Sequence, residues 1–214
     1  MLPFMTPEAP VSIRYIVNRS DSMKKEEKLL ATKSKLLEAA AALMRKAQDP
    51  AEVTSRAIAE KAGVQLAMIN YCFGSREALL FEVFRSGQET YQNDPRVIAV
   101  LSSDLSPKEK LRQFYYLAVE YLVNEYKFTK AITGHLLLHR DLSEGLGSYP
   151  LVAAHYQGRK EEWEIKLISY QLSSMTQLLI FRLEDMSAFL QKELKQEEEL
   201  RALVDHEIDL LLVD

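Results

Sequence analysis

The sequence predicts an all-α protein. Leu, Ala, Glu, Lys and Gln are plentiful, whereas only seven Gly and seven Pro occur in 214 residues, and this composition favours helix. Apolar residues make up 47% and charged residues 27% of the chain, which is typical of a globular rather than a disordered protein. In most segments the apolar positions recur at helical spacing.

Membrane and secreted classes fit the sequence poorly. The longest apolar run is far short of the roughly 20 residues that span a bilayer. The first residues lack the basic and apolar regions of a signal peptide, and a single cysteine cannot form an internal disulfide. We therefore expect a cytoplasmic protein with no membrane segment.

The chain is expected to open with an N-terminal arm, residues 1–22, which contains three Pro and a short β-like run over residues 11–17. The first long helix is predicted from Lys24 to about Ala47, and Asp49-Pro50 ends it. Its apolar stripe consists of Leu29, Leu36, Leu37, Ala40, Leu43 and Met44.

Two short helices joined by a tight turn are predicted next. Thr54 is a good N-cap for a helix to Ala62, and Gly63 supplies the positive φ of a sharp exit. A second short helix covers about residues 65–71, and Ser75 caps the helix after it. This arrangement is a helix-turn-helix, whose second helix lies in the major groove of DNA.

The charge distribution agrees with a DNA-binding segment, although chance segregation is the alternative. Residues 24–76 hold ten basic and six acidic residues, a net +4, whereas residues 77–214 hold fifteen and twenty-three, a net −8. A basic segment on an acidic remainder suggests that this segment meets a polyanion.

The rest of the chain is predicted to be helical. Ser106, Pro107 and Glu109 form a capping-box pattern that starts a helix to about residue 126, and another helix covers about residues 129–140. Residues 143–150 are the most loop-like piece. Two long amphipathic stretches, 159–191 and 196–212, close the chain.

Three groups of residues resemble the N-terminal DNA-binding domain of the TetR family of transcriptional regulators. They are Leu36-Leu37-x-Ala39-Ala40-x-x-Leu43-Met44, Val53-Thr54-x-x-x-Ile58-Ala59-x-x-Ala62-Gly63-Val64, and Ile69-Asn70-Tyr71-Cys72-Phe73-Gly74-Ser75-Arg76-Glu77-x-Leu79-Leu80. The resemblance covers about 50 residues. It implies a DNA-binding domain at 23–76 and a helical ligand-binding and dimerisation domain at 77–214. The sequence departs from the family pattern at two places. It lacks the usual Gly before the first short helix, and it has Cys72 where His or Tyr is common.

The resemblance also implies a function. The protein would be a homodimer that binds an inverted-repeat operator in double-stranded DNA, most often as a repressor, and an unknown small-molecule effector would release it by moving the two DNA-binding domains apart. The sequence does not separate repressor from activator. By position, the DNA-contacting residues would be Thr54, Ser55, Arg56, Gln65, Leu66, Ala67, Met68, Asn70, Tyr71 and Arg76.

Two residues of the predicted DNA-binding domain have alternative interpretations. Arg76 lies in the first turn of a helix, where the macrodipole disfavours a cation unless an anion such as a DNA phosphate is near. The alternative is an exposed arginine that pairs with Glu77. Cys72 could be a redox-sensitive thiol beside DNA, but a small apolar filler is the favoured interpretation.

A ligand cavity is expected in the C-terminal domain, because aromatic residues are concentrated there and pockets are lined by such groups. The candidate ligand-binding residues are Tyr115, Tyr121, His135, His139 and Trp163. The final helices carry apolar stripes that would form the dimer interface as a four-helix bundle. The stripes consist of Leu167, Gln171, Ser174, Leu178 and Phe181, and of Leu200, Leu203, Val204, Ile208 and Leu211.

An enzyme is the main rival class. His135 and His139, four residues apart on one helix, are the only pair that suggests a metal site, so a metal-dependent helical enzyme remains an alternative. A protein-binding adaptor is another, and the absence of a cavity would be its sign. Because no phosphate loop or nucleophile motif occurs, we expect no enzymatic activity, cofactor or metal.

Overall fold

The computed structural model describes the backbone of residues 11–213, and the side chains of residues 23–86, 93–143 and 145–213. Over this range the protein consists of eleven α-helices and two short 3-10 helices, with no strand. The prediction of an all-α fold is confirmed. None of the helices in the described part is long and apolar enough to cross a membrane.

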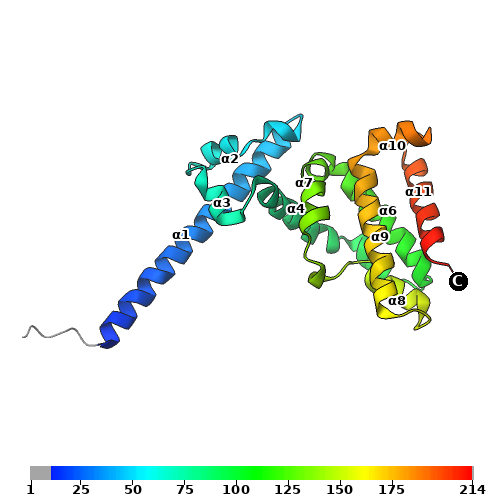
Figure 1. The fold of residues 1–214 in the computed structure, drawn as a ribbon, viewed down its shortest axis with the longest axis horizontal. Coiled ribbons are helices and arrows are strands. Elements are labelled where there is room, and N and C mark those ends of the chain that lie inside the picture. The colour runs from blue at the N-terminus through cyan, green and yellow to red at the C-terminus, as the bar shows by residue number, and fades with distance from the viewer. Residues whose placement is uncertain (1–10, 214) are drawn as a thin grey trace, which may run out of the picture.

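The N-terminal part, called the head here, comprises α1 to α4. Its elements are α1 (Val11–Lys46), η1 (Pro50–Glu52), α2 (Ser55–Ala62), α3 (Ala67–Phe73) and α4 (Arg76–Gln92). In Figure 1 the N-terminal part of α1 projects away from the molecule, while α2 and α3 lie beside its C-terminal part. The elbow between α2 and α3 is the predicted helix-turn-helix.

The prediction of a β-like run at residues 11–17 is wrong, because α1 begins at Val11 rather than near Lys24. No Gly or Pro occurs between Val11 and Lys46, so nothing in the sequence interrupts a helix there. A lone strand would also leave its backbone groups without partners, whereas a helix satisfies them internally.

The local signals around the elbow act as predicted. The Thr54 hydroxyl accepts a hydrogen bond from the amide of Ala57, and the Ser75 hydroxyl accepts one from the amide of Ala78. Gly63 adopts a φ of 66°, in the left-handed region that glycine tolerates best. Helix α3 begins two residues later than predicted. The carbonyl groups of Gln65 and Leu66 accept hydrogen bonds from residues three positions later, which is the 3-10 pattern that often precedes an α-helix.

The core of the head extends into the rest of the protein. It is built from residues of α1, α2, α3 and α4, such as Leu36, Ile58, Ile69 and Leu79, and Ile132 of α7 belongs to the same cluster. Helix α4 therefore connects the two parts of the chain. The predicted domain boundary after residue 76 stays a prediction.

The C-terminal part, called the body, comprises α5 to α11. Its elements are α5 (Pro95–Ser102), α6 (Pro107–Asn124), α7 (Tyr126–His139), η2 (Leu142–Glu144), α8 (Tyr149–Tyr156), α9 (Glu162–Phe181), α10 (Leu183–Leu190) and α11 (Glu197–Leu211). Its core lies between α6, α8, α9 and α11. The stretch predicted as one helix at 159–191 is divided at Arg182 into α9 and α10.

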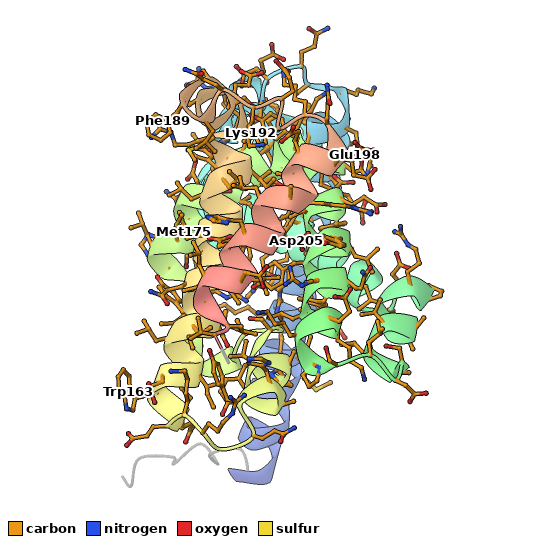
Figure 2. All side chains as sticks on the ribbon, turned by 90° about the vertical axis from the view of Figure 1, so that its right-hand side faces the viewer. Trp163, Met175, Phe189, Lys192, Glu198 and Asp205 are labelled. Carbon is orange, nitrogen blue, oxygen red and sulfur yellow. The ribbon has the colours of Figure 1, made fainter. Side chains whose placement is uncertain are left out.

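Helix α11 is fixed against the body by polar contacts as well as by its apolar stripe. Arg112 of α6 pairs with Asp205 and Asp209 of α11, and the Tyr116 hydroxyl donates to Asp205. Figure 2 shows α11 between α9 and α6, with Asp205 near its middle. The apolar side of α11 therefore faces inward.

This packing corrects part of the predicted dimer interface. Leu200, Val204 and Ile208 are buried within the single chain, so they are core residues and leave no surface for a second copy. Leu203 and Leu211 pack against the same core but are only half-buried, and their place in a dimer interface stays a prediction.

Candidate DNA-binding and ligand-binding sites

Helix α3 presents a solvent-exposed face beyond the elbow. Gln65, Leu66, Ala67, Asn70 and Tyr71 are all exposed, and 65% of the Tyr71 surface is accessible. The opposite side of α3 is anchored by Ile69, which is buried in the head core. The helix is therefore held rigidly while its outer face remains available to a groove of DNA.

Met68 is the exception among the residues predicted on this helix. Its side chain is half-buried and packs against the head core, as does Cys72 one turn later. Residues four apart lie on one face of a helix, so Met68 and Cys72 share the inward side. Met68 is therefore turned away from the most exposed face of α3, and its contact with DNA stays a prediction.

The start of α2 supplies further exposed groups. Thr54 and Arg56 are exposed and Ser55 is half-buried. Arg56 forms no ion pair with any residue that the structure describes. Its charge is thus available to a phosphate, which is the role that the family resemblance implies.

Arg76 is engaged within the head. Its guanidinium donates to the carbonyl oxygens of Val53 and Pro50, and it pairs with Glu77 at 3.1 Å. The side chain thereby joins the N-terminus of α4 to the loop that leads into α2. A phosphate contact by Arg76 stays a prediction, and the structure supports a role in positioning α2.

We expect Arg76→Ala to destabilise the protein. The change removes two charge-assisted hydrogen bonds and takes from the Val53 carbonyl the donor that Arg76 provides, while the Pro50 carbonyl still accepts from the Val53 amide; the expected cost is about 1–3 kcal/mol in free energy of unfolding. Urea denaturation followed by circular dichroism measures this. An unchanged unfolding midpoint, together with a smaller salt dependence of DNA binding, would instead support the phosphate role.

The environment of Cys72 favours the interpretation as a filler. Burial raises the pKa of its thiol, and the nearby Lys33 opposes that rise only in part. The thiolate is the reactive form of cysteine, so a raised pKa reduces reactivity at neutral pH.

The body contains a small cavity, called the chamber here, of about 150 Å³ between α6, α8 and α9. Tyr115 and Tyr121, two of the predicted ligand-binding residues, line it. Its complete lining is Phe114, Tyr115, Ala118, Tyr121, Leu122, Arg140, Gly147, Ser148, Ser173, Thr176 and Gln177. Except for the aromatic residues, sequence reasoning missed this set, because polar residues scattered over three segments leave no periodic signal.

Two neighbouring hollows share residues with the chamber. One, of about 200 Å³, opens beside Tyr170 and Ser174 of α9, and the other is a cleft of about 950 Å³ between the head and the body. Arg140 and Gln177 line all three spaces. Arg140 follows directly after α7, so this end of α7 lies at the centre of the cavity system.

His135 and His139 line the cleft rather than the chamber. Their ring centroids are 5.0 Å apart, and burial together with the neighbouring His139 lowers the pKa of His135. Within the described residues, no group of three or more His, Cys, Asp or Glu side chains is placed to hold a metal ion.

Trp163, another of the predicted ligand-binding residues, lies away from every cavity described above. Its indole is 61% exposed near the N-terminus of α9, and the indole N–H donates to Glu161 at 2.8 Å. Sequence alone could not separate an aromatic residue in a cavity from one on an outer face.

The outer side of α9 is largely exposed and partly apolar. We call it the α9 face, and it consists of the exposed Leu167, Tyr170, Gln171 and Leu178 and the half-buried Ser174. Figure 2 shows Trp163, Met175 and Phe189 along one edge of the molecule, on α9 and α10. Phe181 of the predicted interface is half-buried at the end of the helix. The first predicted stripe is thus mostly accessible, unlike that of α11.

Comparison with known proteins agrees with this geometry. Residues 36–83 match the family model described as "Bacterial regulatory proteins, tetR family". No match was found among curated proteins.

Two solved structures from Rhodococcus sp. RHA1 are similar to the chain. A TetR transcriptional regulator is 18% identical, with a TM-score of 0.51, and the match covers 88% of this chain and 98% of that one. A TetR-like transcriptional regulator is 16% identical, with a TM-score of 0.48. This second match covers 83% of this chain and 93% of that one. At this identity the first likeness concerns the fold. The family match spans α1 to α4 around an exposed α3, and it identifies residues 36–83 as a DNA-binding domain of the kind found in TetR-family regulators.

Proposed function

We propose that this regulator is a homodimeric repressor that a small molecule releases from an inverted-repeat operator. The observation that carries the proposal is the position of α7. Ile132 and Leu136 of α7 belong to the core of the head, while Arg140 at its end lines the chamber. One helix therefore contacts both the DNA-binding part and the candidate effector site.

In this proposal α3 enters the major groove. Gln65 and Asn70 face base edges, while Thr54, Ser55, Arg56 and Tyr71 meet the backbone. All of these side chains are exposed except that of Ser55, which is half-buried, and this exposure supports the assignment. Leu66 and Ala67 are also on the exposed face and would contact the groove floor or the thymine methyl group.

The homodimer would form through the α9 face. Exposed Leu167, Tyr170 and Leu178 make an apolar strip along a 20-residue helix, which a second copy related by two-fold symmetry would cover. A stable interface of this kind buries on the order of 2,000 Å². The two half-sites of such an operator lie one helical turn of DNA apart, about 34–36 Å. Both can be bound at once only if a dimer holds two heads at that spacing.

Release would follow from a shift of α7. A ligand in the chamber contacts Arg140, and displacement of this end of α7 changes how its other residues pack against α4. Because only Gly74 and Ser75 separate α4 from α3, the spacing between the two heads of a dimer would change. The adaptor alternative anticipated a body without a cavity, so the chamber favours a ligand-responsive regulator.

The test is DNA binding to the region upstream of the gene. We expect the protein to bind an inverted repeat there with a Kd of about 10⁻⁸ M or lower, at least about 10³ times more tightly than random DNA of equal length. Fluorescence anisotropy at fixed salt measures both. Equal affinity for both DNAs throughout the upstream region would contradict operator binding, and activation of a reporter by the protein would contradict repression.

A further inference from the structure

The chamber is divided into an apolar and a polar side. Phe114, Tyr115 and Tyr121 of α6 form the aromatic wall, together with Leu122. The opposite side carries hydroxyl, amide and guanidinium groups of Arg140, Ser148, Ser173, Thr176 and Gln177. A ligand that fits this division has an apolar part and a hydrogen-bonding part.

Ser148 is the residue that points most directly to a ligand. It is 2% exposed, it lines the chamber, and its Oγ is buried without a hydrogen-bond partner. The Tyr115 hydroxyl lies near enough for Ser148 to oppose the burial that raises the pKa of Tyr115, yet no hydrogen bond of normal geometry joins the two. Buried hydroxyl groups are nearly always hydrogen-bonded, so a ligand acceptor would supply the missing partner.

Ser173 offers a second donor beside the first. Its Oγ accepts from Arg140 Nη1 at 3.3 Å and from Gln177 Nε2 at 3.4 Å, so its own proton is left for another acceptor. Arg140 adds a positive charge to the same wall. No acidic side chain is among the described residues that line the chamber. Donors and a cation thus converge on this wall, while the Glu207 carboxylate lies close enough to raise the pKa of Tyr115 on the other wall.

The chamber itself, of about 150 Å³, offers room for a small ligand, and the neighbouring hollows that share Arg140 and Gln177 adjoin it. A carboxylate is planar and accepts several hydrogen bonds, which suits an arginine flanked by two hydroxyl donors. We infer that the effector site of the proposed function selects a small organic anion, an aromatic or short-chain carboxylate, whose carboxylate lies at Arg140, Ser148 and Ser173.

Calorimetry with matched probes tests the inference. Benzoate, phenylacetate and hexanoate are each compared with the corresponding neutral amide, on the full-length protein at pH 7.5. We expect at least one of the acids to bind at least tenfold more tightly than its amide. Equal or tighter binding of all the amides, or no binding of any probe, would overturn the inference.

Variants separate recognition of the anion from general effects. Arg140→Gln is expected to weaken binding of the acid at least tenfold and that of the amide less than threefold, and Arg140→Lys to recover part of the affinity. Ser148→Ala is expected to weaken the acid severalfold. Arg201→Gln removes the same charge from the surface of α11, where Arg201 pairs with Glu197, and is expected to leave both affinities unchanged. Acid binding unaltered by Arg140→Gln would contradict the assignment.

Thermal melts of each variant, with and without ligand, show whether the fold is intact. Operator binding is measured separately in the presence of the tightest acid. If the acid binds with the expected selectivity but the operator complex persists, the ligand class holds and release by that ligand fails. If the protein binds the operator but binds no acid more tightly than its amide, the proposed repressor stands and this inference falls.

Discussion

Leu178→Asp on the α9 face is expected to convert the protein to a monomer and to lower its affinity for the operator at least about 100-fold. Leu178 is 39% exposed in the single chain, so a charge there is tolerated by the fold. In a symmetric interface the same charge appears twice and must lose its water on both sides. Light scattering should then give the mass of one chain, 24.5 kDa, instead of twice that value.

A matched substitution controls for surface charge. Ile98→Asp places the same group on α5, where Ile98 is 50% exposed and outside the α9 face. It should leave the dimer and its operator affinity unchanged. If Leu178→Asp stays dimeric, or if a monomer binds the operator as tightly as the wild type, the α9 face is not the interface.

Features that depend on neighbouring residues were predictable from the sequence. The caps at Thr54 and Ser75 and the turn at Gly63 each rest on groups within four residues, so residue type alone indicates them. Most of the helices followed from the same local signals and from the apolar spacing, but α5 and α8 were not predicted. The family resemblance at residues 36–80 coincides with this locally determined part.

Features that depend on residues far apart in the chain were not predictable from the sequence. The stripe of α11 indicated that Leu200 and Ile208 would be covered, but the covering partner, the chain's own α6 and α9, was a matter of tertiary packing. An amphipathic pattern is the same for a core and for an interface. The partners of Arg76 were unpredictable for the same reason, because the carbonyl groups that it contacts lie 23 and 26 residues away in the chain.

The candidate ligand site shows most clearly how far prediction from the sequence reaches. Aromatic content suggested a cavity, and the structure places Tyr115 and Tyr121 in one, but it leaves Trp163 outside. The polar wall comes from the end of α7, the start of α8 and the middle of α9. Only the fold brings such segments together.

Within the head, affinity and specificity are expected to separate between α2 and α3. Arg56 has no ion-pair partner among the described residues, so Arg56→Ala should remove one phosphate interaction per half-site. Binding should weaken on operator and random DNA alike. The slope of log K against log salt should shrink by about one unit for each phosphate that the protein no longer neutralises. Tyr71→Phe, which removes only a hydroxyl, should weaken binding with little change in slope.

Gln65→Ala and Asn70→Ala should behave differently, because both replace an uncharged polar side chain on the exposed face of α3 and leave the charge of the head unchanged. Each is expected to cost about 1–3 kcal/mol of operator binding per half-site while affinity for random DNA changes little. Anisotropy titrations of both DNAs at several salt concentrations measure affinity and slope together, with Arg201→Ala on α11 as the charge control. A weaker operator preference in Arg56→Ala with an unchanged slope, or equal weakening on both DNAs in Asn70→Ala, would reverse the roles assigned to α2 and α3.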